Sequence, residues 1–116
     1  MRDIRERTLD FALRIIKLCQ QLDDQHGVGR TLGWQLLRSG TSIGANLEEA
    51  QAGQSKLDFI SKNAIALKEA RETIYWLRLL AASKIVPMER LVELQSEADE
   101  LARIIGAIIV SAKKRK

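Results

Sequence analysis

The sequence predicts an all-α protein, an antiparallel up-down-up-down four-helix bundle, and three observations support this fold. Apolar residues recur at the three- and four-residue spacing of a helix along almost the whole chain. Short segments containing glycine, proline or polar residues divide this pattern into four stretches. Amphipathic helices joined by short turns pack most simply as antiparallel neighbours. With 116 residues and one proline, the chain is expected to form a single domain, residues 1–116.

The first helix is expected over residues 3–25, where two adjacent apolar rows give a face wide enough to touch two neighbouring helices. These rows hold Phe11, Ile15, Leu18 and Leu22, and Leu9, Ala12, Ile16 and Cys19. Cys19 is the only cysteine, and we interpret it as a small core residue in a reducing cytoplasm. The only histidine, His26, lies in the first turn and is expected at the surface rather than in a metal site.

The second helix is expected over residues 32–52, with Thr31 as a possible N-cap. It contains Gly33, Gly40 and Gly44 close together on one strip. Each glycine costs a mid-helix position on the order of 1 kcal/mol relative to alanine. The strip from Gly40 to Gly44 is therefore predicted to lie at short range against another helix.

The third helix is expected over residues 55–83, with Ser55 as its N-cap. Arg71 falls in the row of residues that we assign to its core face, between Leu67 and Ile74. An arginine at such a position needs an acidic partner or a route to water. We predict an ion pair with Glu49 of the second helix. The predicted structural polar network consists of Arg71, Glu49, Glu48 and Asn46.

The fourth helix is expected to begin at Pro87 and becomes apolar on nearly all sides beyond Glu100. A small bundle cannot bury every side of its last helix, so some of these side chains are expected to contact a partner. The third helix has a similar excess of apolar residues on its outer side. The predicted contact surfaces between copies consist of Ile65, Trp76 and Leu79, and of Ile104, Ile109 and Val110.

The net charge of +4 comes from the last four residues, because residues 1–112 contain 15 basic and 15 acidic side chains. A basic tail favours contact with nucleic acid, although it also stabilises the helix dipole. The predicted nucleic-acid-binding residues are Lys113, Lys114, Arg115 and Lys116, with Arg14, Lys17 and Lys62 as further candidates in the body. The charged N-terminus and the short apolar runs predict neither a secretory signal nor a membrane span.

Catalysis is not predicted, since the sequence lacks the usual site patterns. It contains no Cys–His pair, no cluster of metal ligands and no phosphate-binding glycine loop. We therefore expect a protein that is not an enzyme and needs no cofactor.

The central motif, LLRSGTSIGAN over residues 36–46 followed by Glu48-Glu49-Ala50, resembles the 23S rRNA-intervening-sequence, or four helix bundle, protein family. Segments 55–60 and 68–77 extend the resemblance to nearly the whole chain. It implies a bacterial four-helix bundle that assembles as a homopentameric ring. A related branch, the accessory variability determinant of diversity-generating retroelements, implies binding of nucleic acid and a reverse transcriptase.

Two functions remain open at this stage. One is an oligomeric accessory protein that binds RNA or DNA through its basic tail. The other is a structural or protein-interaction oligomer whose tail serves solubility. The neutral body and the spare apolar side chains favour the second, whereas the tail and the resemblance favour the first.

Overall fold

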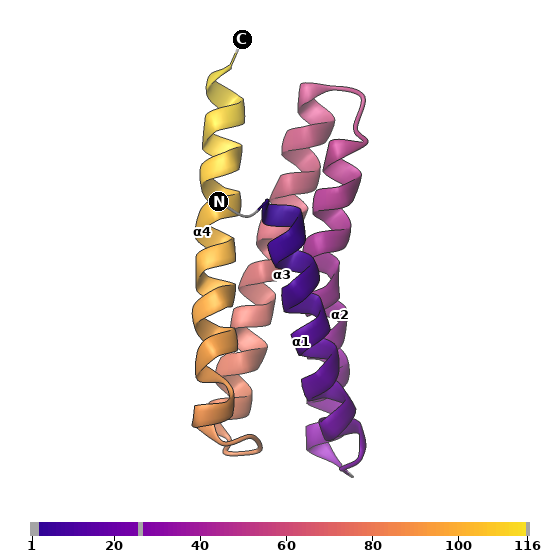
Figure 1. Cartoon of the computed structure of the whole chain (residues 1–116), viewed down its shortest axis with the longest axis vertical. Coiled ribbons are helices and arrows are strands. Elements are labelled where there is room, and N and C mark those ends of the chain that lie inside the picture. Colours follow the sequence, from indigo (N-terminus) through magenta and orange to yellow (C-terminus); the bar gives the residue numbers. More distant parts are fainter. Residues whose placement is uncertain (1–2, 26, 116) are drawn as a thin grey trace.

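The computed structural model describes residues 3–25 and 27–115. Four helices, α1 (Ile4–Asp23), α2 (Val28–Gln51), α3 (Lys56–Ala82) and α4 (Val92–Lys114), run alternately down and up along a body of 51 × 21 × 21 Å (Figure 1). A short 3-10 turn, η1 (Met88–Arg90), precedes α4. The described residues contain no strand, and the predicted four-helix bundle is confirmed.

The starts of α1 and α3 follow ordinary capping chemistry. The carboxylate of Asp3 accepts a hydrogen bond from the backbone N–H of Arg5 at 2.8 Å. The hydroxyl of Ser55 accepts one from the backbone N–H of Asp58 at 3.1 Å, which confirms Ser55 as the N-cap of α3. Each cap satisfies a donor that the first helical turn leaves without a partner.

The starts of α2 and α4 differ from the prediction. Helix α2 begins at Val28, so Thr31 lies inside it rather than at its cap. Gly27 precedes it with φ of 87°, a conformation that a residue without Cβ adopts freely and that lets the chain turn sharply. Pro87 does not start α4 directly but leads into η1, and α4 begins five residues later, at Val92.

The buried face of α3 lies beside the predicted one. It consists of Asn63, Ala66, Ala70, Thr73, Leu77 and Leu80. Leu67 and Ile74, which the prediction placed at its centre, are partly buried at its flank. Arg71 is exposed, so the prediction that it lies on a core edge is wrong. Because α3 packs on both α2 and α4, its buried face is centred on the small residues between those contacts.

The predicted polar network is also wrong as a unit, because Arg71 and Glu49 form no ion pair in the described chain. The carboxylate of Glu49 instead pairs with the ammonium of Lys62 at 2.8 Å. Glu48 lies 3.8 Å from Arg5, and the amide of Asn46 donates to the carbonyl of Ser42 in its own helix. Along the antiparallel pair of α2 and α3, Glu49 lies level with Lys62 and Ser39 with Thr73. Arg71 is nine residues beyond Lys62, roughly 13 Å along α3, and is therefore too far from Glu49 to pair with it.

The glycine strip lies against α1, as predicted. A Cβ added at Gly40 would lie 3.0 Å from Cγ2 of Ile15, and one at Gly44 would lie 3.1 Å from Oγ1 of Thr8. Both distances are shorter than ordinary contacts of a Cβ atom. The glycines therefore set the close approach of α1 to α2.

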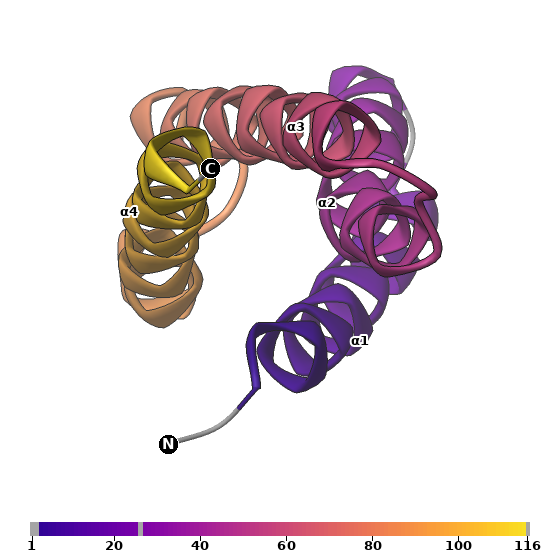
Figure 2. The same ribbon diagram turned by 90° about the horizontal axis from the view of Figure 1, so that it is seen from above.

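Consecutive helices form the three extensive contacts of the bundle, and the contact of α1 with α4 is much smaller than these. Viewed from above, the ribbons of α1 and α4 stand apart while their neighbours lie side by side (Figure 2). Arg7 crosses this seam to Glu97 and Glu100, and Arg14 crosses it to Glu93. The core beneath is closed nonetheless, since Phe11 is buried.

Candidate functional site

Basic side chains from two helices gather at one end of the bundle. Lys113 and Lys114 form the last turn of α4 and Arg115 caps it. The ammonium of Lys56, at the start of α3, donates to the backbone carbonyl of Arg115. All four side chains are exposed, and within the described chain none of them forms an ion pair. The predicted tail residue Lys116 lies outside the described residues.

The three basic candidates of the body do not join this cluster. Arg14 lies 3.5 Å from Glu93, near the start of α4, which is the opposite end of the bundle (Figure 1). Lys62 is paired with Glu49 at 2.8 Å. Lys17 is exposed on α1, on the same side as Arg14. Because two of the three are neutralised by carboxylates, the body offers less free positive charge than the C-terminal end.

The predicted apolar patch on α3 is smaller than its residues suggest. The indole N–H of Trp76 donates to Glu72 at 2.9 Å, and its ring meets that of Tyr75 edge-on with centroids 5.3 Å apart. Trp76 also packs on the core and, like Leu79, is only partly exposed. Ile65 is the most exposed residue of the predicted set.

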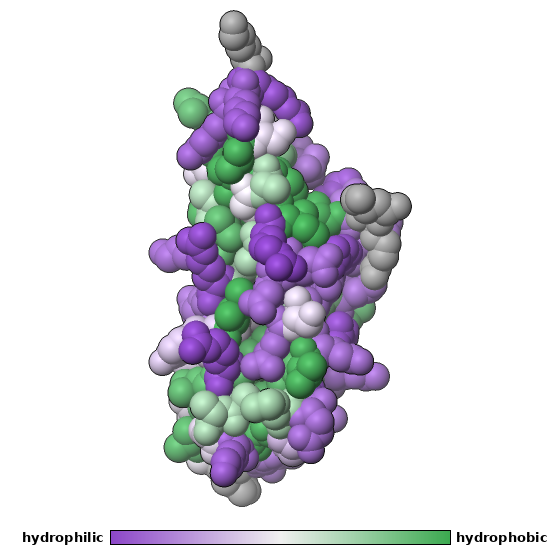
Figure 3. All heavy atoms as spheres, turned by 90° about the vertical axis from the view of Figure 1, so that its left-hand side faces the viewer, coloured by the Kyte–Doolittle hydropathy of each residue, from purple (hydrophilic) through white to green (hydrophobic). Residues whose placement is uncertain are grey.

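The predicted patch on α4 does not exist as one surface. Ile109 is buried in the core, Val110 is exposed and Ile104 is half-buried. Successive helical residues are rotated by about 100°, so these three side chains point in different directions. Ile104 instead lines an apolar notch with Phe59 and Ile108 beside the C-terminal end of α4. The notch lies next to Arg115. Figure 3 shows hydrophobic side chains below the hydrophilic upper tip of the molecule.

The sequence reasoning missed a larger apolar surface on the outer side of α1 and α2. Leu9, Leu13 and Ile16 follow one another along α1, and Leu9 is 61% exposed. Trp34 on α2 is 60% exposed beside this row. The helical spacing was visible in the sequence, but Leu9 and Ile16 were assigned to a second buried row. We call these four residues the α1–α2 face.

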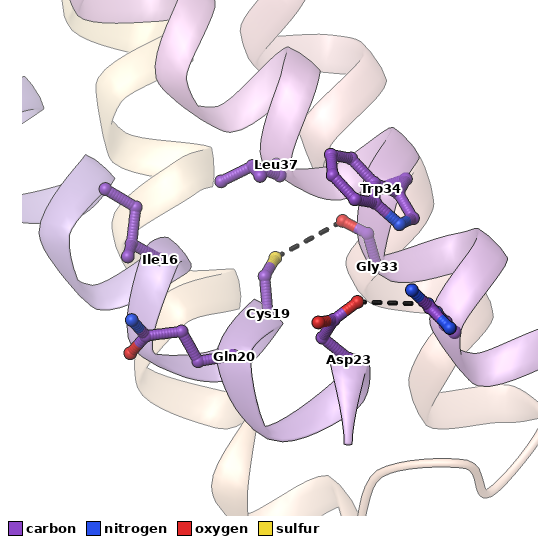
Figure 4. A pocket seen from close by; sticks show the side chains of 8 residues that line it. Ile16, Cys19, Gln20, Asp23, Gly33, Trp34 and Leu37 are labelled. Carbon is purple, nitrogen blue, oxygen red and sulfur yellow. Dashed lines mark hydrogen bonds and ion pairs between the residues drawn. The ribbon is translucent and has the colours of Figure 1, made fainter. Parts of the chain in front are cut away.

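A hollow of about 160 Å³ opens in the α1–α2 face (Figure 4). Ile16, Trp34 and Leu37 form its apolar walls, and Cys19 and Gly33 form its floor. The thiol of Cys19 donates to the carbonyl of Gly33 at 3.3 Å. Burial raises the pKa of this thiol to about 11, so it stays protonated and unreactive at neutral pH.

Polar groups border the hollow only at one end. Asp23 and Arg30 form an ion pair at 3.1 Å there, next to Gln20. Every buried polar side-chain atom in the described chain has a hydrogen-bond partner. The hollow therefore suits an uncharged, apolar group rather than a charged ligand.

The other polar contacts within the bundle serve its packing. The hydroxyl of Thr73 donates to that of Ser39 at 2.9 Å between α3 and α2. Arg38 pairs with Glu69 and Glu72 across the same seam. The hydrogen bond of Thr73 with Ser39 joins residues 34 positions apart in the sequence.

Comparison with known families identifies the chain. The family model of the 23S rRNA-intervening sequence protein matches residues 2–107. The chain belongs to this family. The match ends before the basic residues 113–116, so the tail lies outside the segment that defines the family.

The chain is also similar to a solved structure over most of its length. The crystal structure of a protein with unknown function from the S23 ribosomal protein family of Bacteroides thetaiotaomicron superposes with a TM-score of 0.86. It is 40% identical in sequence, and the alignment covers 92% of this chain and 98% of that one. A search among curated proteins finds no match. Neither the family nor the structural relative indicates a class of enzyme.

Two further observations concern binding chemistry. The residues that the structure describes contain no group of three or more His, Cys, Asp or Glu side chains placed to hold a metal ion. None of the described helices has the length and apolar character that crossing a membrane requires.

Proposed function

We propose that this protein is a self-associating helical bundle without enzymatic activity that binds nucleic acid weakly through the basic end of the bundle. The observation that carries the proposal is the gathering of Lys56, Lys113, Lys114 and Arg115 from two helices, exposed and without ion pairs among the described residues. Lysine and arginine at such a site neutralise phosphates and release counterions. The free, buried Cys19 suits a reducing compartment, and we place the protein in the cytoplasm.

The family supports a connection with RNA by its description as a 23S rRNA-intervening sequence protein, and the relative by its assignment to the S23 ribosomal protein family. Self-association would increase the effect of a small basic cluster, because several linked contacts bind more tightly than one. The resemblance favours five copies. Contacts with phosphates carry no sequence information, so we expect binding that tolerates many sequences.

The experiment compares the intact protein with the triple variant Lys113→Gln/Lys114→Gln/Arg115→Gln. Fluorescence anisotropy with labelled single-stranded RNA and double-stranded DNA, at about 50 and 200 mM salt, measures affinity and its salt dependence. The triple variant should bind at least roughly tenfold more weakly at low salt. Its logarithmic salt slope with RNA should fall by about 2, since each phosphate contact contributes about 0.7.

A matched control removes the same charge elsewhere. Lys68, Arg71 and Arg78 are exposed on α3 and form no ion pair within the described chain, so Lys68→Gln/Arg71→Gln/Arg78→Gln changes the net charge equally. This control should bind within about twofold of the intact protein. If both triple variants lose affinity to the same extent, binding depends on net charge alone and not on the basic end.

The second candidate function is an interaction oligomer with no role at nucleic acid. The α1–α2 face favours it, because a row of exposed leucine, isoleucine and tryptophan side chains usually meets a protein partner. If the protein binds neither RNA nor DNA at low salt, the interaction oligomer remains as the supported function. A monomer by light scattering at micromolar concentration would contradict self-association in both candidates.

A further inference from the structure

We propose that the apolar notch beside the C-terminal end of α4 takes up one unpaired nucleobase of a single-stranded nucleic acid. The inference rests on the nucleic-acid binding proposed above and names the class of ligand, a strand whose bases are free. The basic end of the bundle holds the phosphates of this strand, and the notch holds a base. Ile104, which the sequence placed in a contact between copies, is assigned to this site instead.

The notch is open because α4 extends beyond α1 at this end of the bundle. Arg7 of α1 lies level with Glu97 and Glu100 of α4, and α1 begins only three residues before Arg7. Helix α4 continues from Glu100 to Lys114, roughly 20 Å further. Figure 1 shows the upper part of α4 rising above the start of α1. The part of α4 that lines the notch therefore lies mostly beyond the described start of α1.

Apolar side chains of two helices form the walls of the notch. Ile104 and Ile108 lie one helical turn apart on α4, and Phe59, near the start of α3, lines the same notch. All three are half-buried, whereas the neighbouring Ile105 and Ile109 are buried in the core. The volume of the notch is about 330 Å³, which is at the lower end of the range for small-molecule pockets. A flat aromatic group gains there by leaving water and by stacking on the ring of Phe59.

Basic side chains border the notch on the side of the bundle end. A second hollow of about 290 Å³ is lined by Lys56, Phe59 and Arg115, and the last two of these also line the notch. Lys56 is held at this place because its ammonium donates to the backbone carbonyl of Arg115. Asp58 is the acidic residue of this turn of α3, and the basic residues of the bundle end outnumber it. A base in the notch thus has cations beside it for its own phosphates.

A single strand fits this combination better than other occupants do. A duplex keeps its bases paired and stacked, so it offers none to the notch without the cost of unpairing. An apolar helix of a second protein would leave the basic side chains at the rim without opposite charges. Proteins that bind single strands without sequence preference combine cations for the backbone with aromatic rings for the bases. The notch and the basic end provide both within one site.

Strands without bases test whether a base enters the notch. Fluorescence anisotropy at about 50 mM salt compares labelled strands of about ten nucleotides, namely oligo(U) RNA, oligo(dT) DNA and a DNA backbone with abasic sites throughout. Both strands that carry bases should bind at least about fivefold more tightly than the abasic strand, which is the smallest factor expected from one stacked base. Equal binding of all three strands would overturn the inference, while the proposed contact with phosphates would stand.

Variants of Phe59 test the stacking. Phe59→Leu keeps an apolar side chain and removes the aromatic ring, whereas Phe59→Tyr keeps the ring. Phe59→Leu should bind oligo(U) and oligo(dT) at least about threefold more weakly than the unmodified protein and should bind the abasic strand equally well. Phe59→Tyr should bind all three strands as the unmodified protein does. Equal affinities of both variants for oligo(U) and oligo(dT) would overturn the role of the ring.

A variant that fills the notch tests the place of binding. Ala107 is exposed and lines the notch, so Ala107→Gln occupies it with an uncharged side chain. It should lose at least about threefold in affinity for oligo(U) and keep its affinity for the abasic strand. Ala82→Gln is the matched control, because Ala82 is exposed at the opposite end of α3, and it should bind as the unmodified protein does. Thermal melting shows that each variant is folded.

The remaining outcomes separate this inference from the proposed function. If Ala107→Gln binds oligo(U) as the unmodified protein does, the base lies elsewhere and the inference is overturned. If Ala107→Gln instead changes the molar mass of the assembly in light scattering, the notch is a contact between copies, which also overturns it. If the unmodified protein binds none of the three strands, the inference fails together with the proposed binding of nucleic acid.

Discussion

At the scale of single residues, Arg7 joins the N-terminal turns of α1 to α4 through Glu97 and Glu100. Its Nη2 and Nε atoms lie 2.6 and 3.2 Å from the two carboxylate oxygens of Glu97, and Nη1 lies 3.2 Å from Glu100. The hydrogen bonds that Arg7 donates to Glu97, and then to Glu100, raise the pKa of Arg7 and keep its guanidinium charged. A bidentate ion pair of this kind fixes the relative orientation of the two side chains as well as the distance between them.

Replacing Arg7 by methionine should lower the free energy of unfolding by about 1–3 kcal/mol, between the values typical of exposed and buried pairs. The reason is that the Arg7 side chain is 19% exposed and Glu97 would be left half-buried without its partner. Urea denaturation measures the change. Arg38→Met is the control, because Arg38 is 51% exposed and its pairs should contribute no more than about 1 kcal/mol. Equal losses in both variants would contradict the special role of Arg7.

Cys19 gives the protein a measurable dependence on pH. Its thiol has a pKa of about 11 in the folded chain against an ordinary 9.0, because burial disfavours the thiolate. Only about one thiol in 1,000 is then ionised at pH 8, so the native protein should react far more slowly with a thiol reagent than the urea-unfolded protein.

The same shift predicts how stability changes in alkali. Between pH 9 and 11 the unfolded chain loses the Cys19 proton before the folded chain does, so this group lowers stability as pH rises. Below pH 9 its contribution is constant. Denaturation curves of the native protein and of Cys19→Ala should therefore diverge in this interval. Parallel curves would show that the thiol is accessible to water in the folded state.

At the scale of secondary structure elements, the contact of α1 with α2 depends on glycine. Gly40→Leu should lower the free energy of unfolding by roughly 1–3 kcal/mol through overpacking, because even the first carbon would lie 3.0 Å from Ile15. Gly106, inside α4, has open space where its Cβ would stand. Gly106→Ala should therefore raise stability by about 0.5–1 kcal/mol through helix propensity alone. Thermal melting of the two variants should shift in opposite directions.

The sequence predicted that each helix exists. It did not predict how each helix is rotated about its own axis or at which residues it begins and ends. The apolar periodicity of α3 predicted a helix over residues 55–83, close to the observed Lys56–Ala82, but its buried face lies on Ala66, Ala70 and Thr73. Small residues give a weak hydrophobic signal, and their place in the core depends on how closely α2 approaches. In the same way, Gly27 rather than Thr31 is the residue before α2, since the turn there has a positive φ, which favours glycine.

At the scale of the whole molecule, the prediction of four antiparallel helices was correct because binary patterning and short turns restrict the packing to few solutions. The candidate surfaces were harder to predict. Which side of a wide apolar face remains exposed depends on where the other three helices lie, so Leu9 and Ile16 were assigned to the core. Ile109 was assigned to the surface for the same reason. The basic tail was visible in the sequence, but the approach of Lys56 to Arg115 joins residues 59 positions apart.

The contacts between consecutive helices are much larger than the contact of α1 with α4, and this difference affects the order in which the chain folds. Since the extensive contacts join helices that are consecutive in the sequence, most contacts form between residues that are near one another along the chain. Such a topology has a low contact order, and helical bundles of this kind fold on the order of microseconds to milliseconds. The seam between α1 and α4 is the contact that requires the longest loop to close. We therefore expect a folding transition state in which α2 and α3 are already paired. The ion pair of Arg7 with Glu97 should form only after this transition state.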